Sequence, residues 1–425
     1  MSTANQIAVS NLIASKTTQF FNNISKVFAT ANQDFLGDFK NKSYATGGNV
    51  TIKIPGSPVT QRGLSVTPTA IQDLTVNYNL TEDDIINVTR QVDLLVSEFD
   101  ILGGDGALTT TSKAAIVDNY GYPAYLAMEK DIEKRLALLL KTNAYYSPID
   151  RISKLGGINN FAAVQQVDTM MEDLQLTQMD RTMMFNTKDA ANVSNSLQNS
   201  FNVGLNSRIS PEGWIGGTKD KGRLAGLDCM RSNSFLKHTA GPLSGRTDIT
   251  VVSVASDGLS IVLSVGGSSS GNLIKAGDRF AFTTIYWVQN PGLEVLPYNV
   301  TLAALEDSNG DGAGNVTLQL AYPLLASGEH INVNALPAPG AAVECFPSYN
   351  LNFAYTKAGV SAAPLSMGQI YGAANSEKRL NDTNMSVNVY MQGAVTEGSN
   401  IIRLATLVPM KVFTPYVIAL PSAVA

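Results

Sequence analysis

Residues 278–288 read DRFAFTTIYWV, and this run of apolar, aromatic and β-branched side chains predicts a buried β-strand. Around it, from about Thr239 to Phe346, the 3.6-residue period of a helix is absent. Further runs of the same kind are separated by Gly, Asn, Pro and Asp clusters: TDITVVSV, LSIVLSV, YNVTLAAL and NVTLQLAY. Short strands at this spacing predict a small all-β barrel or sandwich.

This all-β block lies between two linker-like stretches, HTAGPLSGR and LPAPGAAV, and mixed patterns resume on both sides. Before it, RTMMFNTKDAANVSNSL predicts a buried strand, a turn and a helix capped near Asn186 or Thr187. After it, MSVNVYMQG and NIIRLATLV alternate apolar and polar residues as strands do. The block is therefore predicted to be inserted into an α+β domain.

A long helix, here named the spine helix, is predicted over residues 124–142, with Pro123 suited to its first turn. Its apolar face is formed by Leu126, Ile132, Leu136 and Leu139 or Leu140. Its water-facing side carries Glu129, Lys130, Glu133 and Lys134. Asp131 and Arg135 are spaced as an i, i+4 pair worth about 0.2–0.5 kcal/mol. A second helix over residues 159–176 has one apolar face, formed by Val164, Val167, Met171 and Leu174.

The N-terminal segment carries an apolar stripe at helical spacing, formed by Phe20, Phe21, Ile24, Val27 and Phe28. We expect this stripe to dock either on the chain's own domain or on a neighbour. Residues 46–80 then change period, since NVTIKIP and LTVNYNL alternate on either side of a stretch rich in Pro, Gly and Thr. Two strands joined by a long polar loop predict an extended hairpin, which gains stability by lying on another surface.

The stretch EDSNGDGAGNVT, residues 306–317, begins like an EF-hand calcium loop. Alternating oxygen ligands and a glycine match positions 1, 3, 5 and 6 of that loop: Asp307, Asn309, Asp311 and Gly312. Position 12, which should be a bidentate carboxylate, is Leu318. Because Asn, Asp and Gly also supply the positive-φ positions of turns, we interpret the stretch as a hairpin tip between YNVTLAALE and NVTLQLAYP. Weak calcium binding is the alternative.

The bulk composition excludes several function classes. The chain has 425 residues, of which 44% are hydrophobic and 15% charged, against roughly 25% charged in typical soluble domains. A weakly charged surface suits extensive protein–protein contact. The net charge of −5 does not favour binding driven by phosphate neutralisation. The N-terminus lacks a basic head and no 18-residue apolar run occurs, so neither a signal peptide nor a membrane span is predicted.

No constellation in the sequence assembles an active site. The Cys and His residues are too few and too dispersed for a zinc site: Cys229, Cys345, His238 and His330. We interpret these residues as hydrogen-bonded buried residues or surface residues. The alternative is that one His and one Cys form a nucleophilic pair. An adjacent acidic pair is interpreted as surface charge: Asp83 and Asp84. We therefore predict no enzyme activity and no catalytic, cofactor-binding or metal-binding residues.

The order of these elements resembles the major capsid proteins of tailed bacteriophages with the HK97-like fold, and most of all the P22-type coat proteins, which carry an inserted β-barrel. MEKDIEKRLALLLKTNAYYSP is similar to their spine helix, RTMMFNTKDAANV to the strand–turn–helix of the apical domain, and GRLAGLDCMRSNSFLKHTAG to the passage into the insertion. IKAGDRFAFTTIYWV is similar to the insertion's entry strand and IIRLATLVPMKVFTPYVIALPS to the closing strands. The segment between TDITVVSV and IKAGDRFAF is short beside the contact loop of some relatives, so no inter-capsomer contact is carried over from that loop.

The resemblance implies an α+β HK97-like capsid fold with an inserted all-β barrel domain. Its implied parts are an N-terminal arm (1–45), an extended loop or E-loop (46–80), a peripheral domain with the spine helix (81–157), an apical domain (158–238), the inserted barrel (239–346), the return of the apical domain (347–375) and the C-terminal strands of the peripheral domain (376–425). No crosslinking residues are carried over.

The resemblance also implies a function. The chain is expected to be a major capsid protein that self-assembles, as pentamers and hexamers, into the icosahedral shell around a viral dsDNA genome. Scaffolding protein and portal would be partners during assembly in the bacterial host cytoplasm, packaged dsDNA would be contacted non-specifically, and no membrane or cofactor is involved. The alternatives are an encapsulin-like compartment shell protein, a surface adhesin or S-layer protein with a calcium-binding β-domain, and a hydrolase with a carbohydrate-binding insertion.

Overall fold

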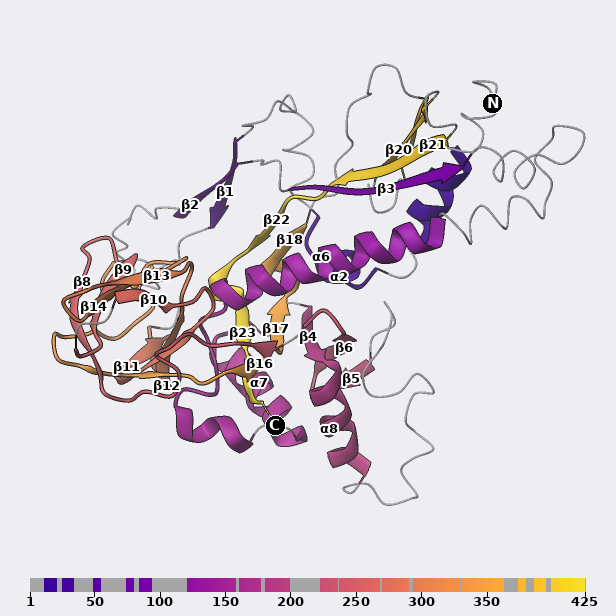
Figure 1. Cartoon of the computed structure of the whole chain (residues 1–425). Coiled ribbons are helices and arrows are strands. Elements are labelled where there is room, and N and C mark those ends of the chain that lie inside the picture. The colour runs from indigo at the N-terminus through magenta and orange to yellow at the C-terminus, as the bar shows by residue number, and fades with distance from the viewer. Residues whose placement is uncertain are drawn as a thin grey trace, which may run out of the picture. The chain divides into compact units, whose positions relative to one another are not determined.

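The computed structural model describes residues 11–20, 25–33, 49–54, 74–79, 84–93, 121–157, 160–176, 180–198, 222–235, 237–267, 270–289, 293–328, 330–362, 374–379, 386–394 and 399–424. The chain divides into two compact units. Unit 1 comprises Met1–Val50, Tyr78–Arg135 and Ser361–Lys411, and unit 2 comprises Thr51–Asn77, Leu136–Val360 and Val412–Ala425. Helices and strands are interspersed along the chain (Figure 1), which confirms the α+β class.

The predicted spine helix is α6, Tyr122–Asn143, the long magenta helix of Figure 1. Ile132, Leu136 and Leu140 are fully buried, as predicted. The prediction for Leu126 is wrong, since this side chain is 47% exposed. The placement of Glu129 and Glu133 in water is also wrong, because both are buried.

The two buried carboxylates face the N-terminal segment rather than solvent. Residues 11–20 are helical, and a second helix, α2, spans Lys26–Thr30. Ser25 is extended between them and its hydroxyl accepts the Phe28 N–H, so α2 starts anew at this cap. The predicted single helical stripe is therefore interrupted, and Phe21 and Ile24 lie outside the described residues.

The N-terminal segment docks on the chain's own spine helix. The Phe20 ring lies 5.4 Å from the Tyr122 ring and 5.8 Å from the Tyr125 ring, centroid to centroid. Val27 is fully buried. The sequence left open whether this segment docks on the chain's own domain or on a neighbour. The described residues show that it docks on the chain's own domain.

Arg135 of α6 binds a different carboxylate from the predicted one. Its Nη2 pairs with Asp84, and its Nη1 donates to the Val408 carbonyl at 3.3 Å. Asp84 is fully buried, so its interpretation as surface charge is wrong, whereas Asp131 is exposed. A buried carboxylate gains more from a cation than an exposed one does, because water does not screen the pair.

Unit 1 holds a four-stranded antiparallel sheet in the order β19–β20–β21–β3. These strands span Ala374–Arg379, Ser386–Ala394, Ser399–Leu407 and Ile85–Asp93. The alternating stretches after the insertion are thereby confirmed as strands β20 and β21. A two-stranded sheet pairs β18, Val360–Ala362, with β22, Met410–Val412.

The body of unit 2 is a five-stranded sheet in the order β23–β17–β4–β6–β5. Its strands span Val417–Ala419, Phe353–Thr356, Arg181–Asn186, Leu227–Ser232 and Gly222–Leu224. Helices α7, Phe161–Asp173, and α8, Thr187–Gln198, flank β4 in the sequence. Asn186 accepts the Asp189 N–H at 2.8 Å and so caps α8, as predicted.

Short elements complete unit 2. A three-stranded sheet orders β24, Ser422–Ala423, beside β16, Tyr349–Asn350, and β7, Lys237–His238. The 3-10 helices described in this unit are η3, Ile152–Gly157, η5, Lys357–Gly359, and η6, Thr414–Tyr416.

The predicted all-β block is an eight-stranded sheet in the order β10–β13–β14–β9–β8–β15–β11–β12 (Figure 1). In chain order, β8 to β15 span Ile249–Val254, Ser260–Ser264, Ser270–Ile274, Arg279–Val288, Val295–Ala303, Ser308–Asp311, Asn315–Gln319 and Ala342–Cys345. All five strands expected from the sequence are present. Closure into a barrel is not shown, because β10 and β12 end the strand order and no described strand joins them.

The predicted hairpin of residues 46–80 is present as two paired strands, β1, Asn49–Ile54, and β2, Leu74–Asn79. They form a two-stranded sheet to which no other described strand is added. The connection over 55–73 lies outside the described residues. None of the helices in the described ranges is both long and apolar enough to cross a membrane.

Candidate functional site

A set of buried polar contacts joins the inserted sheet to the chain that leaves the spine helix. We name residues 144–152, between α6 and η3, the exit segment. The exit segment and the inserted sheet both belong to unit 2. Arg279 is the first residue of β11.

Arg279 is fully buried and its guanidinium binds the carbonyls at the end of α6. Nη1 donates to the Ala144 carbonyl at 2.7 Å, and Nη2 donates to the Tyr145 carbonyl at 2.8 Å. Nη2 also donates to Thr301 Oγ1 of β12 at 3.2 Å. Carbonyls at a helix C-terminus carry partial negative charge and lack intrahelical donors, so a cation fits this position.

The rest of the exit segment contacts the insertion at four further points between Tyr145 and Ile152. The Tyr145 hydroxyl accepts the Tyr322 N–H at 3.2 Å, and the Tyr146 ring lies 4.5 Å from the Trp287 ring. Further on, two backbone N–H groups are bound by carboxylates across the junction, Asn299 N–H by Asp150 at 3.1 Å and Ile152 N–H by Glu344 at 3.0 Å. The insertion thus supplies partners for polar groups that the exit segment would otherwise bury unpaired.

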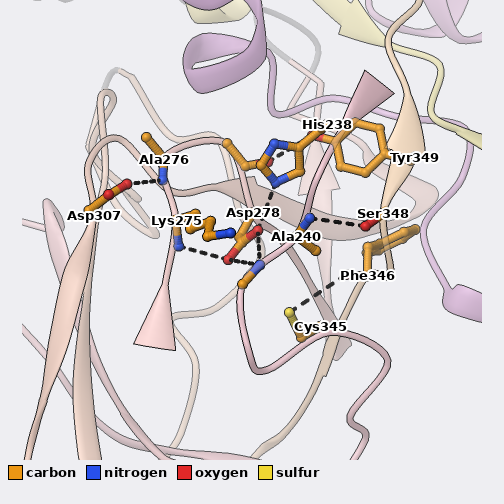
Figure 2. A network of polar contacts seen from close by, with 12 residues as sticks. His238, Ala240, Lys275, Ala276, Asp278, Asp307, Cys345, Phe346, Ser348 and Tyr349 are labelled. Atoms are coloured by element: carbon orange, nitrogen blue, oxygen red, sulfur yellow. Dashed lines mark hydrogen bonds and ion pairs between the residues drawn. The ribbon is translucent and has the colours of Figure 1, made fainter. Parts of the chain in front are cut away.

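Asp278, next to Arg279, holds the root of the insertion together (Figure 2). Its carboxylate lies 2.7 Å from His238 Nε2, and it accepts the N–H groups of Gly241, at 3.1 Å, and Lys275, at 2.8 Å. His238 is on β7, where the chain enters the insertion, and it pairs in register with Tyr349 on β16, where the chain returns. The entry and return strands therefore lie side by side, and Asp278 ties the entry strand to the first residues of β11.

The buried thiols of unit 2 are not activated. Burial, and then the Asp228 charge, raise the pKa of Cys229 to about 12. Burial and the Asp278 charge also raise the pKa of Cys345. In the described part of the chain, Cys229 Sγ contacts the Leu227 carbonyl at 3.6 Å and Cys345 Sγ contacts the Phe346 carbonyl at 3.8 Å, whereas His238 Nε2 contacts Asp278. The fourth residue of that set, His330, lies on the loop between β14 and β15.

Gly277 is required where the last turn of α6 meets the insertion. Its φ is 91°, and an added Cβ would lie 2.4 Å from Cε of Lys141. The Lys141 side chain therefore passes across a surface that only glycine leaves open. Burial lowers the pKa of Lys141, and the carboxylates of Asp278 and Asp307 oppose this shift.

The aspartates of the calcium-like stretch bind in separate turns. Asp307 accepts the Ala276 N–H at 2.8 Å and the Asn272 amide at 3.0 Å (Figure 2 shows the first contact). Asp311 instead accepts the Ala313 and Asn315 N–H groups, at 2.8 and 2.9 Å. In the described part of the chain, no group of three or more His, Cys, Asp or Glu residues could hold a metal ion.

The hairpin interpretation of this stretch is confirmed with one correction. Strand β13 ends just before Gly312 and strand β14 begins soon after it. The two strands are antiparallel, with Gly310 of β13 opposite Val316 of β14. The partner strand is therefore β13, inside the stretch, whereas the expected partner YNVTLAALE contributes β12, which pairs with β11. Residues 308–311 pair with β10, and Gly310 among them also pairs with β14.

Comparison with known proteins places the chain in a family. The family described as P22 coat protein, gene protein 5, matches residues 79–421, which is most of the chain. The chain belongs to the P22 coat protein family. It is accordingly a structural, shell-forming major capsid protein, and the spine helix, the inserted sheet and the junction between them all lie within the matched residues.

Solved capsid structures are also similar to this coat protein. A chain of Mycobacterium phage Che8 matches with 13% identity and a TM-score of 0.40, covering 93% of this chain and 91% of that one. A chain of the capsid of Ralstonia phage GP4 matches with 6% identity and a TM-score of 0.42, covering 90% and 86%. These scores lie below 0.5, so the family assignment rests on the family match. No curated protein matches the chain.

Replacing Arg279 tests the junction. Arg279→Met keeps much of the volume but leaves the Ala144 carbonyl without its donor, so we expect the free energy of unfolding to fall by about 2–4 kcal/mol in urea. The matched control is Arg223→Met, whose side chain is 81% exposed, and which should change the free energy by less than about 0.5 kcal/mol. Equal effects of the two substitutions would contradict the role of Arg279.

Replacing Asp307 and Asp311 together by Ala tests the turn interpretation. We expect melting to begin at a lower temperature, and millimolar calcium or a chelator to shift neither the wild type nor the variant in differential scanning calorimetry. Asp257→Ala is the matched control, because Asp257 accepts the Leu259 N–H at 2.9 Å in another turn of the same sheet. A calcium-dependent rise that the double variant alone loses would establish a cation site.

Proposed function

We propose that this coat protein adopts the HK97-like capsid fold and self-assembles, through pentamers and hexamers, into an icosahedral shell that encloses a dsDNA genome. Assembly takes place in the bacterial host cytoplasm with a scaffolding protein and a portal, and packaged DNA is contacted non-specifically. The role is structural and involves no catalysis. The family match supports the shell-forming core of this proposal.

One observation carries the assembly mechanism: the paired strands β1 and β2 form a sheet of their own among the described strands. A two-stranded ribbon is marginally stable in water by itself. We propose that residues 46–80 are the extended loop and gain their stability by lying on an adjacent subunit. The same hairpin would then couple the ordering of the loop to the formation of the lattice.

The composition is consistent with a lattice built from many modest contacts. Charged residues make up 15% of the chain, so broad surfaces can meet without removing many ions from water. Each subunit of a closed shell meets several neighbours, and contacts that are individually weak then hold it strongly because they act together. The domain boundaries that we propose are those of the resemblance, with the arm over residues 1–45 and the inserted barrel over residues 239–346.

We further propose that the insertion stabilises the subunit from within, closes into a barrel in the complete chain and covers the outer face of the shell. Its fully buried Arg279 and Asp278 support the first of these roles, because both are directed at partners outside the inserted sheet. A compartment shell protein uses the same fold and is the second candidate, whereas the separate roles of Asp307 and Asp311 give a calcium-stapled adhesin no support.

Deleting residues 57–68 tests the extended loop. We expect a folded monomer, with the circular dichroism and urea midpoint of the wild type, that does not form shells or rings of five or six in negative-stain images. Wild-type protein at the same concentration is the positive control for assembly. Normal assembly of the deletion variant would rule out the arm role of residues 46–80, while a wild-type chain that stays monomeric even with its scaffolding protein added would rule out self-assembly into a shell.

A further inference from the structure

Two buried carboxylates of the spine helix share one cation from the N-terminal segment. Glu129 is 7% exposed and Glu133 is 3% exposed, and they lie one helical turn apart on α6. Lys26 Nζ pairs with Glu133 Oε1 at 3.1 Å. The backbone N–H of Lys26 donates to Glu129 Oε1 at 3.2 Å. These contacts fasten the start of α2 to the spine helix.

In this group of Lys26, Glu129 and Glu133, one buried carboxylate oxygen lacks a hydrogen-bond donor among the described residues. Glu129 Oε2 is buried and has no hydrogen-bond partner among the described residues. If both carboxyl groups were ionised, the described residues would bury two negative charges beside the one positive charge of Lys26. A single proton on Glu129 would balance the charges and would cancel the repulsion between the two carboxylates.

The surroundings favour that proton. Burial, followed by the charge of Glu133, raises the pKa of Glu129 to about 7, and contacts with Ser25 and Lys26 only partly oppose the shift. Tyr125 also faces the pair, and burial together with the charges of Glu129 and Glu133 raises its pKa, so it remains a neutral phenol. Lys26 is the cation that the described N-terminal segment brings to the pair.

We propose that residues 25–33 are a proton-operated latch on the spine helix, closed when Glu129 is protonated and loosened when it ionises. The sign follows from proton linkage. A released segment exposes Glu129 to water, where its ordinary pKa of about 4.3 applies, so the open state is ionised at neutral pH. Closing therefore takes up one proton, and the closing equilibrium weakens as pH rises until Glu129 also ionises in the closed state, near pH 7.

Hydrogen exchange of the unassembled full-length chain tests the latch. Protection factors of the amides of residues 25–33, corrected for the intrinsic rate at each pH, are measured by mass spectrometry from pH 6 to pH 8. This range lies above the sequence pI of about 5.2, where the chain keeps its negative charge. We expect wild-type protection to fall about fivefold between pH 6 and pH 7 and by less than about twofold between pH 7 and pH 8, where it levels off.

Two variants separate the latch from a general loss of structure. Glu129→Gln carries the neutral side chain permanently, so its protection should stay constant over the whole range. Asp131→Asn is the matched control, because Asp131 is exposed on the same helix, and it should keep the wild-type slope. Amides of β4 report on the fold in every sample. A wild-type protection that does not change with pH, or a Glu129→Gln variant with the wild-type slope, would overturn the proposal.

Discussion

The arrangement of unit 2 depends on one interaction: the Arg279 guanidinium binds the Ala144 and Tyr145 carbonyls, which directly follow α6. A helix end buried without donors is strongly unfavourable, and here the donors come from a strand more than a hundred residues away in sequence. The insertion therefore supplies hydrogen-bond donors that buried carbonyls of the body need. It cannot be removed without leaving the exit segment unpaired, and this is why we regard inserted sheet and body as one cooperative unit.

The neighbouring contacts serve the same constraint. Asp278 ties the entry strand to β11, and Gly277 leaves room for Lys141, so the end of the helix and the start of the strand meet at close range. Asp307, which suggested calcium in the sequence, holds the turn at Ala276 that presents Gly277.

The sequence predicted elements with strong periodicity and missed those created by distant partners. The strands β8, β9, β11, β12 and β14 are visible as apolar runs, whereas β10 and β13 are short and rich in polar residues and Gly, and β13 pairs with both β10 and β14. The sequence places Glu129 and Glu133 on the water-facing side of the helix, because the spacing of apolar residues along a helix does not reveal that a second segment covers it. Arg279 lies at the start of a predicted strand, but its role could not be predicted, because its partners are backbone carbonyls, which have no sequence signature.

The claim that insertion and body form one cooperative unit is tested most directly by hydrogen exchange of the full-length chain across a urea series. Amides of the exit segment and amides of β11 are followed in the same samples. We predict that both sets lose protection at the same urea concentration. Retention of β11 protection at concentrations where the exit segment already exchanges freely would show an autonomous insertion and contradict the account.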